Sequence, residues 1–248
     1  MDIKDSIALV TGANRGIGAA FVAELLKRGV KKIYVAARDT ASLHELLQQG
    51  DKRLVPLPLD VTDADQVAAA ANVATDVTLL INNAGVSKYE GALSANDTAS
   101  ARQEMEVNYF GTLEMTRAFA PVLASHGGGA VINMLSMLSY VSLPRAATYA
   151  ASKAAALSLT RSLRAELGAQ KTQVIGVVAV QTETSMGSVM PEPRMTTAEV
   201  VGDVLDALQA GTNDEVVAGA QTRGTMEAFL ADPKGMQAMM LTRLPIRA

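Results

Sequence analysis

The segment from Ile7 to Gly18, IALVTGANRGIG, constrains this chain more than any other. Four apolar residues lead into a glycine-rich turn, and apolar residues at helical spacing follow, which is the pattern of a strand, a tight loop and a helix. Gly12, Gly16 and Gly18 lack a Cβ, so the backbone can bend sharply there and approach a ligand closely. The free N–H groups at the start of such a helix favour an anion. The segment therefore predicts a βαβ unit that binds the pyrophosphate of a dinucleotide.

The glycine spacing makes this prediction dependent on the rest of the chain. It is Gly-x-x-x-Gly-x-Gly instead of the general Gly-x-Gly-x-x-Gly. Three glycines in seven residues also occur in turns that are merely flexible. Other segments must therefore support a nucleotide site.

Size and composition indicate an α/β fold. The 248 residues include no linker rich in Pro, Gly or Ser, and folds of this class commonly reach such a length as one domain. Hydrophobic residues make up 49% of the chain and aromatic residues only 4%, so small aliphatic side chains must form the core, which suits helices packed on a parallel sheet. We expect one doubly wound, Rossmann-type domain over residues 1–248, with about seven mostly parallel strands and helices on both faces of the sheet.

Charge and residue content argue against several classes of function. The 22 basic and 25 acidic residues are spread along the chain, so no basic stripe is available for nucleic acid. There is no Cys for a disulfide, a thiolate site or a nucleophile, and the two histidines, His44 and His126, fall in segments expected at the surface, so we expect no metal. The first expected strand leaves no room for a cleavable signal peptide, and no apolar run reaches the ~20 residues of a membrane span. We expect a cytoplasmic protein without a membrane partner.

The remaining apolar runs predict alternating strands and helices. We expect further strands at 32–37, 54–59, 77–81, 130–135, 174–180 and 215–218, and helices at 19–28, 40–49, 62–72, 99–124, 149–168 and 196–210, the last capped by Thr197. Residues 185–195 are rich in Met and Pro and form a candidate substrate-covering loop. The tail, residues 225–248, contains several methionines and is expected to contribute to the core or to a subunit contact.

The end of the second expected strand bears on the choice of cofactor. At this position an acidic residue would bind the ribose 2′-hydroxyl of NAD, whereas an arginine suits the 2′-phosphate of NADP. Ala37 ends the strand and Arg38 follows it, and Arg15 in the glycine loop can reach the same phosphate. We therefore expect NADP(H) in preference to NAD(H). Asp39 could still serve an NAD ribose, and both arginines could be ordinary surface charges.

A Tyr-x-x-x-Lys pair stands at the start of an alanine-rich helix. Tyr149 and Lys153 are four residues apart, so they lie on one helix face and can converge on one substrate atom. A free Tyr has a pKa near ~10, and a nearby ammonium favours the phenolate, which we expect to bring the pKa of Tyr149 toward the neutral range. A surface pair would have the same sequence, so the pair alone is weak evidence.

The glycine segment, a second motif and the position of a serine make the sequence resemble the short-chain dehydrogenase/reductase family. TGANRGIG at residues 11–18 matches the family's TGxxxGxG, and NNAG at 82–85 matches its second signature, each at the end of an expected strand. Ser136 precedes Tyr149 by thirteen residues, which is the family's interval. The resemblance implies the catalytic set Ser136, Tyr149, Lys153 and Asn108, with Asn108 holding a water through a distorted helical turn. Ser139 competes with Ser136, and Asn108 could be an ordinary helix residue.

The resemblance extends the expected cofactor site beyond the glycine loop. The NNAG backbone would lie beside the adenosine ribose, Asp60 and Val61 would contact adenine, and Thr184 would bond the nicotinamide carboxamide. The sequence departs from the family at Ala179 and Val180, where Pro-Gly is usual, which removes a preset turn and puts the pose of the nicotinamide in doubt. The complete expected set is Gly12, Asn14, Arg15, Gly16, Ile17, Gly18, Arg38, Asp60, Val61, Asn82, Ala84, Gly85, Tyr149, Lys153 and Thr184.

The function implied is the NADP(H)-dependent interconversion of a ketone and a secondary alcohol, as in carbonyl reductases and alcohol dehydrogenases. Ser136 would hydrogen-bond the carbonyl oxygen, Tyr149 would protonate it, and NADPH would supply hydride, with Lys153 also holding the nicotinamide ribose. The alternative is a sensor or scaffold on the same fold that binds NADP(H) without chemistry.

The expected substrate is a hydrophobic or aromatic small molecule. Its pocket would be lined by Leu138, Tyr140, Leu143, Met186 and Met190. Acyl-carrier-linked substrates, sugars, sterols and simple aryl ketones all remain open.

A homodimer or homotetramer is expected. The resemblance implies a two-fold interface built from the helices at 99–124 and 149–168. The alanines between residues 146 and 156 would permit close helix approach, although the same alanines could face the sheet.

Overall fold

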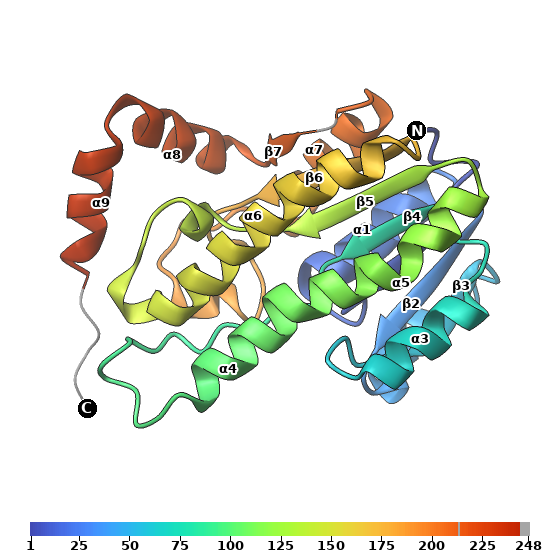
Figure 1. Ribbon diagram of the computed structural model, residues 1–248, viewed down its shortest axis with the longest axis horizontal. Helices are drawn as coiled ribbons and strands as arrows, with labels where there is room; N and C mark the ends of the chain where they lie inside the picture. Colours follow the sequence, from blue (N-terminus) through green and yellow to red (C-terminus); the bar gives the residue numbers. More distant parts are fainter. Residues whose placement is uncertain (213, 244–248) are drawn as a thin grey trace.

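A seven-stranded parallel sheet organises the computed structural model, which describes residues 1–212 and 214–243 (Figure 1). The strand order is β3-β2-β1-β4-β5-β6-β7, and every neighbouring pair is parallel. The order reverses between β1 and β4, which opens a crevice at the carboxyl ends of the strands. The expected doubly wound fold is thus confirmed. The strands are β1 Ile7–Thr11, β2 Lys32–Ala37, β3 Leu54–Pro58, β4 Leu79–Asn82, β5 Gly129–Met134, β6 Thr172–Val178 and β7 Glu215–Val217.

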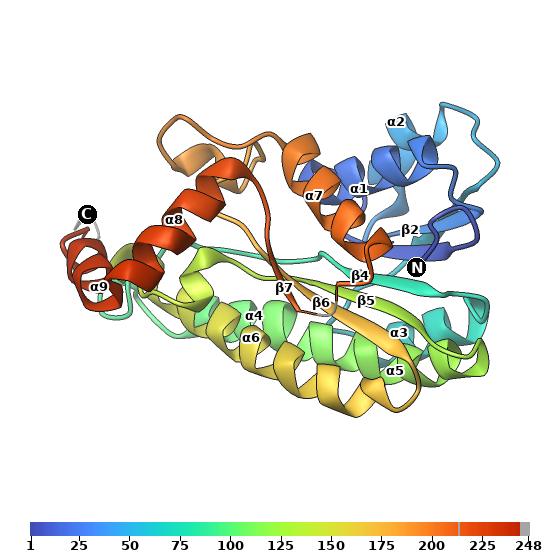
Figure 2. The same ribbon diagram turned by 90° about the horizontal axis from the view of Figure 1, so that it is seen from above.

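Helices cover both faces of the sheet (Figure 2). Helices α1 Gly16–Lys27, α2 His44–Leu47 and α7 Thr197–Gln209 lie on one face, and α3 Ala64–Val73, α5 Gly111–Ser125 and α6 Ala147–Gly168 lie on the other. Alternate residues of β1 feed the two layers, because successive side chains of a strand point to opposite faces. Val10 packs in the core with Phe21 of α1, whereas Leu9 packs in the core with Phe119 of α5.

The helix expected at 99–124 is interrupted. Helix α4 Ala99–Met105 continues into a π-helical turn at Glu106–Phe110 and then into α5. The Gly111 N–H bonds to the Glu106 carbonyl, five residues back, which accommodates one extra residue in the turn. Glycine is needed at 111 because a Cβ there would lie 2.7 Å from Val61 Cγ2. Hydrophobic periodicity carries no signal for this turn, and only the resemblance to the family implied it.

Two further expectations about helices are wrong in detail. Residues expected as a helix at 40–49 form a 3₁₀ turn at Thr40–Leu43 followed by the single turn of α2, because the Asp39 side chain accepts a hydrogen bond from the Ala41 N–H and caps the 3₁₀ turn. Thr196, not Thr197, caps α7, since its hydroxyl accepts from the Glu199 N–H. The extended backbone of a capping residue decides which of two threonines takes this position.

The C-terminal segment forms an arm of two helices. Helix α8 Ala220–Ala231 follows β7, and α9 Pro233–Leu241 turns away from it at Asp232, whose carboxylate accepts from the Gly235 N–H. Helix α9 lies beside the segment that joins β5 to α6 in both views (Figures 1 and 2). The tail expected at 225–248 therefore contributes two helices, and its residues 244–248 lie outside the described part.

Candidate active site

A cleft of about 900 Å³ lies at the carboxyl edge of the sheet. Its walls are made by residues that follow β1, β2, β3, β4, β5 and β6, together with the loop before α7 and the arm α8–α9. The glycine loop lies at one end and the methionines of α9 at another. This crevice is where open parallel sheets bind their ligands.

The glycine loop forms a cradle that only glycine permits. Gly12 and Gly16 have φ values of 65° and 56°, in the left-handed region. A Cβ on Gly18 would lie 2.1 Å from the Gly12 carbonyl oxygen, so α1 presses directly on the loop. The N-cap residue of α1, Arg15, makes no side-chain cap, and the first turn of α1 contains no acidic residue. These features fit the pyrophosphate of a dinucleotide.

The NNAG segment locks the end of β4 to the end of β1. The Thr11 hydroxyl accepts from the N–H groups of Asn83 and Ala84, at 2.9 and 3.0 Å. The Asn83 side chain donates to the carbonyl oxygens of Thr11 and Gly12, at 2.9 and 3.2 Å. Asn83 lines the cleft and was missed by sequence reasoning, although it stands in the quoted motif.

Asn82, which was expected at the cofactor, lies beneath the cleft. Its side chain is buried and donates to Thr116 and Asn133, at 3.1 and 2.8 Å. It therefore connects β4 to α5 and β5 and supports the sheet. Gly18 likewise does not line the cleft and acts by letting α1 approach the loop.

The end of the cleft expected to hold adenosine carries two arginines. Arg15 and Arg38 both line it, both are exposed, and neither forms an ion pair among residues 1–212 and 214–243. Asp39 also lines the cleft, but its carboxylate caps the 3₁₀ turn that follows. The other expected residues on this wall are Asn14, Ile17, Asp60, Val61, Ala84 and Gly85.

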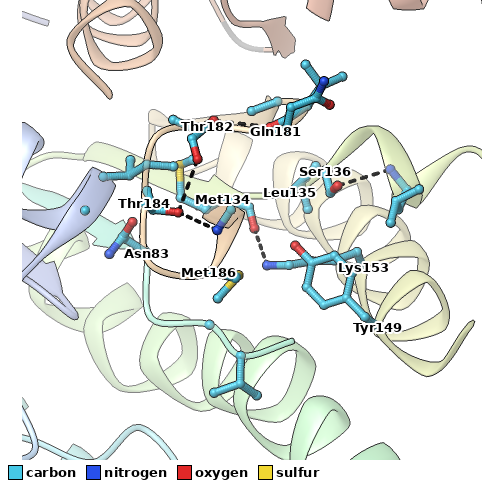
Figure 3. A pocket seen from close by; sticks show the side chains of 18 of the residues that line it. Asn83, Met134, Leu135, Ser136, Tyr149, Lys153, Gln181, Thr182, Thr184 and Met186 are labelled. Atoms are coloured by element: carbon cyan, nitrogen blue, oxygen red, sulfur yellow. Dashed lines mark hydrogen bonds between the residues drawn. The ribbon is translucent and has the colours of Figure 1, made fainter. Parts of the chain in front are cut away.

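Ser136, Tyr149 and Lys153 converge at the inner part of the cleft (Figure 3). Ser136 follows β5 and starts the 3₁₀ turn Met137–Ser139, and the other two residues lie one turn apart on α6. The Ser136 hydroxyl accepts from the Leu138 N–H at 3.1 Å and can donate its own proton toward Tyr149. Ser139 is buried and its hydroxyl accepts from the Ser136 N–H, so the structure places Ser136, and not Ser139, on the cleft wall.

Burial dominates the electrostatics of this group. Lys153 is only 5% exposed, and burial lowers its pKa to about 8. Its Nζ donates to the Met134 carbonyl at 2.8 Å and lies 5.8 Å from the centre of the Tyr149 ring. Burial, the neighbouring Tyr89 and the Glu104 carboxylate all raise the pKa of Tyr149, and only Ser136 opposes them. The expected lowering of the Tyr149 pKa by Lys153 is thus wrong in this structure, because the ammonium is directed at a carbonyl.

Asn108 occupies the π-helical turn, so a distorted turn is present where one was expected. Its side chain is buried, and its Oδ1 accepts from the Val86 N–H at 2.9 Å. Its Nδ2 donates to the Val86 carbonyl and to the Ser152 hydroxyl, each at 2.9 Å. Asn108 therefore holds the chain after β4 against α6 and does not itself line the cleft.

Glu104 is a charged residue beneath the site that sequence reasoning missed. It is fully buried on α4, and its carboxylate accepts from the Lys88 N–H at 2.8 Å and from the Thr148 hydroxyl. Thr148 immediately precedes Tyr149. The available signal was spacing, because a residue four positions before Asn108 lies on the same helix face.

The end of the cleft expected to hold the substrate is lined mostly by apolar side chains. Leu138, Leu143, Met186 and Met190 line it as expected. Tyr140 does not: its ring packs edge-on against Phe229 of α8, with the ring centres 5.8 Å apart, and its hydroxyl accepts from Arg161. Residues of the arm, together with Arg243 just after it, line the cleft and were not expected there: Gln221, Gly224, Thr225, Ala228, Met236, Met239, Met240 and Arg243.

The expected covering loop is closed at its base. Thr182 forms an isolated bridge with Met195, and the Glu183 N–H donates to the Met195 carbonyl at 2.8 Å. Thr184 lines the cleft and accepts from the Gly187 N–H at 3.0 Å. Arg194 donates to the Met190 carbonyl at 3.2 Å. These bonds, with one from Gln221 of α8 to the Pro193 carbonyl at 3.3 Å, fix the segment, of which Ser185, Met186, Gly187 and Met190 line the cleft.

A tertiary contact stands where the family's Pro-Gly turn is missing. The Thr222 hydroxyl of α8 accepts from the Val180 N–H at 3.2 Å, and the Ala179 carbonyl accepts from the Met137 N–H at 2.9 Å. The arm thus fixes the backbone that a proline would otherwise restrict.

Within the described ranges, no three His, Asp or Glu side chains come close enough together to hold a metal ion. Over the same residues, no helix has the length and apolar character needed to cross a membrane.

Comparison with known proteins identifies the family. The family model described as short chain dehydrogenase matches residues 6–194. Galactitol 2-dehydrogenase of Cereibacter sphaeroides is 34% identical over 237 residues, covering 93% of this chain and 89% of the relative. The D-erythrulose reductase of Gallus gallus is 33% identical over 183 residues, with 73% of each chain covered. A 3alpha-hydroxysteroid dehydrogenase of Mediterraneibacter gnavus is 30% identical over 205 residues, covering 77% of this chain and 80% of the relative.

Solved structures agree with this comparison. A short chain dehydrogenase from Burkholderia cenocepacia J2315, in complex with NADP, is 44% identical, with a TM-score of 0.91, and covers 97% of this chain and 99% of its own. The NADPH-bound carbonyl reductase from chicken fatty liver is 28% identical, with a TM-score of 0.75, and covers 83% of this chain and 91% of its own. Fold, site and comparisons together define an NAD(P)-dependent oxidoreductase. The chain belongs to the short-chain dehydrogenase/reductase family.

Proposed function

We propose that this protein is an NADP(H)-dependent oxidoreductase that interconverts a hydrophobic ketone and its secondary alcohol. The observation that carries the proposal is the convergence of Ser136, Tyr149 and Lys153 in a cleft that also contains the glycine cradle. A protein that only bound the dinucleotide would have no physical need for a phenol, a hydroxyl and a buried ammonium at the far side of the cleft.

The chemistry assigns a role to each of these side chains. A bound nicotinamide supplies or accepts the hydride at the reacting carbon. The Ser136 hydroxyl donates a hydrogen bond to the carbonyl oxygen. Tyr149 gives its phenolic proton to the same oxygen during reduction and takes it back during oxidation. Lys153 would hold the nicotinamide ribose hydroxyls through its buried ammonium.

Asn108 is proposed to complete this set by way of the π-helical turn. Its side chain fixes Val86 and Ser152, so the distorted backbone around it is held beside α6. We propose that this backbone positions a water that carries protons between Tyr149 and solvent.

The preference for NADP(H) rests on the adenosine end of the cleft. Arg15 and Arg38 line the cleft without an ion pair among the described residues, so both guanidiniums are available for a 2′-phosphate. The Asp39 carboxylate already accepts a backbone hydrogen bond and is less available to a ribose hydroxyl. The relatives from Burkholderia cenocepacia and chicken were solved with NADP and NADPH, respectively.

An apolar substrate is supported by the side chains around the catalytic group. Leu138, Leu143, Met186 and Met190 offer no hydrogen-bond donor stronger than a backbone N–H. The sugar and polyol substrates named for two relatives carry several hydroxyls, and these four side chains would desolvate such hydroxyls without offering them a partner. The hydroxysteroid named for a third relative is closer in character to this pocket.

We also propose a homo-oligomer that uses α5, α6 and the π-helical turn. Phe110 is 43% exposed in that turn, and Ala151 and Ala154 are exposed on α6. Ala150 and Ala156 are buried, so the alanine-rich helix serves the sheet with one face and leaves another open. Sedimentation should give a dimer or a tetramer at micromolar concentration, and a monomer would refute this part of the proposal.

The function is tested by turnover of the purified protein. A panel of ketones and secondary alcohols is assayed with NADPH or NADP⁺, and again with NADH or NAD⁺. We expect reduction of hydrophobic ketones with a higher kcat/KM for NADPH than for NADH. Cofactor binding without turnover of any compound in either direction would instead establish the sensor or scaffold alternative.

A further inference from the structure

Arg145 is a partly buried cation that the proposed mechanism does not use. It stands in the 3₁₀ turn Pro144–Ala146, which joins the cleft wall at Leu143 to the start of α6. Its Nε atom is buried and has no hydrogen-bond partner among the described residues. Burial of a charged donor without a partner costs free energy, so such an atom calls for a partner from outside the chain.

The edge of the guanidinium that contains this atom is held only weakly. Within residues 1–212 and 214–243, no carboxylate pairs with Arg145. Its Nη2, on the same edge as Nε, donates to the Met190 sulfur at 3.9 Å, and a thioether is a weak acceptor. Met190 lines the cleft and has a flexible side chain, so a ligand in the cleft can displace its sulfur and reach the guanidinium.

Tyr89 links this cation to the proposed catalytic residues. Its side chain lines the cleft. Burial raises the pKa of Tyr149, and the neighbouring Tyr89 raises it further. Burial also raises the pKa of the Tyr89 phenol, whereas the Arg145 guanidinium opposes that effect. Arg145 therefore lies near a cleft phenol that in turn lies near Tyr149.

The charges around the cleft favour an anion at the end expected to hold the substrate. Among the described residues, the carboxylates that line the cleft are those of Asp39 and Asp60, which follow β2 and β3 at the opposite end. Lys153 and the exposed Arg243 also line it, and neither forms an ion pair in the described part of the chain. Glu104 lies beneath the site, but its carboxylate oxygens already accept from a backbone N–H and a hydroxyl. An anion would therefore meet more positive than negative charge there.

From these observations we propose that Arg145 binds a carboxylate of the substrate, so that the protein acts on apolar keto acids. The ketone of such a substrate lies at Ser136 and Tyr149, its apolar body lies against the methionines, and its carboxylate replaces the Met190 sulfur. Nε and Nη2 form the edge that donates two parallel hydrogen bonds to a carboxylate, so both weakly used donors gain a partner at once. The proposal rests on the proposed ketone reductase function and names its substrate class.

The experiment compares phenyl keto acids with their methyl esters in the full-length protein, with NADPH as the reductant. The probes 4-oxo-4-phenylbutanoate, 5-oxo-5-phenylpentanoate and 6-oxo-6-phenylhexanoate place the carboxylate at increasing distances from the ketone. In the wild type we expect one of these acids or more to have a kcat/KM about tenfold above that of its ester, because only the acid gains the charged hydrogen bonds.

Arg145→Gln removes the charge and should abolish this preference. We expect kcat/KM for the preferred acid to fall by about tenfold or more, mainly through KM, while kcat/KM for its ester stays within about twofold of the wild type. Arg145→Lys keeps the charge but loses the paired donors, so it should retain part of the preference. Thermal unfolding and turnover of the ester report whether each variant is folded.

Arg102→Gln is the matched control, because it removes the same charge from an exposed position on α4 that does not line the cleft. It should leave the ratio of kcat/KM for acid and ester at the wild-type value. Arg243→Gln, at an exposed arginine of the cleft, should lower the ratio less than Arg145→Gln, since solvent screens its charge.

Three outcomes would overturn the role of Arg145 while turnover of the esters upholds the reductase function. They are a wild type that prefers none of the acids to its ester, an unchanged ratio in Arg145→Gln, and a loss of the ratio in Arg102→Gln or Arg243→Gln as large as in Arg145→Gln. Absence of turnover of every ketone by the wild type would instead refute the proposed function and this proposal with it.

Discussion

The two ends of the cleft are built by different means. The cofactor end is shaped mainly by backbone atoms of one short segment. Gly12 and Gly16 have left-handed φ values, and α1 approaches the loop closely at Gly18. At the substrate end, side chains from the covering loop, α8 and α9 meet from segments that are distant in sequence. A backbone cradle tolerates almost no substitution, whereas a wall of methionines can change one side chain at a time. One end can therefore stay constant while the other adapts to a new substrate.

Tyr149→Phe should have the largest effect, because it removes turnover while leaving cofactor binding at the other end of the cleft intact. The phenol is the only group proposed to transfer a proton to the carbonyl oxygen, whereas Ser136 only hydrogen-bonds it, so removal of the phenol should lower kcat by about 10²–10⁴-fold. Cofactor affinity should change little, because the cradle is left intact. NADPH fluorescence titration measures the affinity and NADPH consumption measures turnover. Turnover retained at the wild-type level would mean that another group transfers the proton.

Gly18→Ala breaks the cofactor end while leaving the methionine wall intact. The new Cβ would lie 2.1 Å from the Gly12 carbonyl oxygen and 2.6 Å from the Asn83 amide, so the loop and α1 must separate. We expect cofactor affinity to fall by on the order of 100-fold and stability by about 2 kcal/mol.

Gly202→Ala is the matched control for this change. Gly202 lies in α7, its φ is not in the left-handed region, and a Cβ added there would have no neighbour within 4 Å. The substitution should leave cofactor affinity unchanged and raise stability by about 0.5–1 kcal/mol. Equal affinities in the two alanine variants would refute the cradle.

The sequence predicted the cofactor end better than the substrate end for a physical reason. The cradle is local, so its glycines, strand and helix stand within a dozen residues, and the Tyr149–Lys153 pair follows from helical periodicity. Tyr140 was expected in the pocket, but tertiary packing on Phe229 turns it away. The position of α9 beside the cleft depends on a contact between Gln237 and Ser142, and no local sequence pattern predicts a contact over such a separation.

The electrostatics around the proposed catalytic residues could not be predicted from the sequence either. Helical spacing correctly places Lys153 near Tyr149, but burial and the Met134 carbonyl decide what the ammonium does. Glu104 is fully buried, although a glutamate in a helix is ordinarily expected at the surface, so the sequence did not reveal its place beneath the site.

Arg38→Ala tests which part of the cofactor the glycine-loop end of the cleft recognises, without disrupting the loop itself. Loss of one charged hydrogen bond to a 2′-phosphate should weaken NADPH binding by about tenfold or more. Binding of NADH, which lacks that phosphate, should change less than about twofold by the same reasoning. Titration of both nucleotides measures the two effects, and an equal loss for NADPH and NADH would show that Arg38 does not read the phosphate.

Glu104→Gln is expected to give the smallest effect, a shift in pH dependence. The carboxylate raises the pKa of Tyr149, so its removal lowers that pKa, and alcohol oxidation requires the ionised phenol. The rise of kcat/KM for oxidation should therefore move to lower pH, by about one unit or less. Glutamine can still accept from Lys88 N–H and donate to the Thr148 hydroxyl.

Glu106→Gln is the control for the removal of charge alone. Glu106 lies two residues further along the chain and is exposed, so solvent and salt screen it. Its variant should keep the wild-type pH profile. A profile that moves in Glu106→Gln but not in Glu104→Gln would contradict the electrostatic role of the buried carboxylate.

The most direct test of the account follows the hydride itself. The wild-type protein is incubated with a hydrophobic ketone and NADPH that carries deuterium at C4 on one face of the nicotinamide ring, and then with the label on the other face. We predict deuterium at the carbinol carbon of the alcohol from one label and none from the other, because the wall with Ser136, Tyr149 and Lys153 presents the substrate from one side. Alcohol without deuterium from either label, or no alcohol at all, would contradict hydride transfer in this cleft.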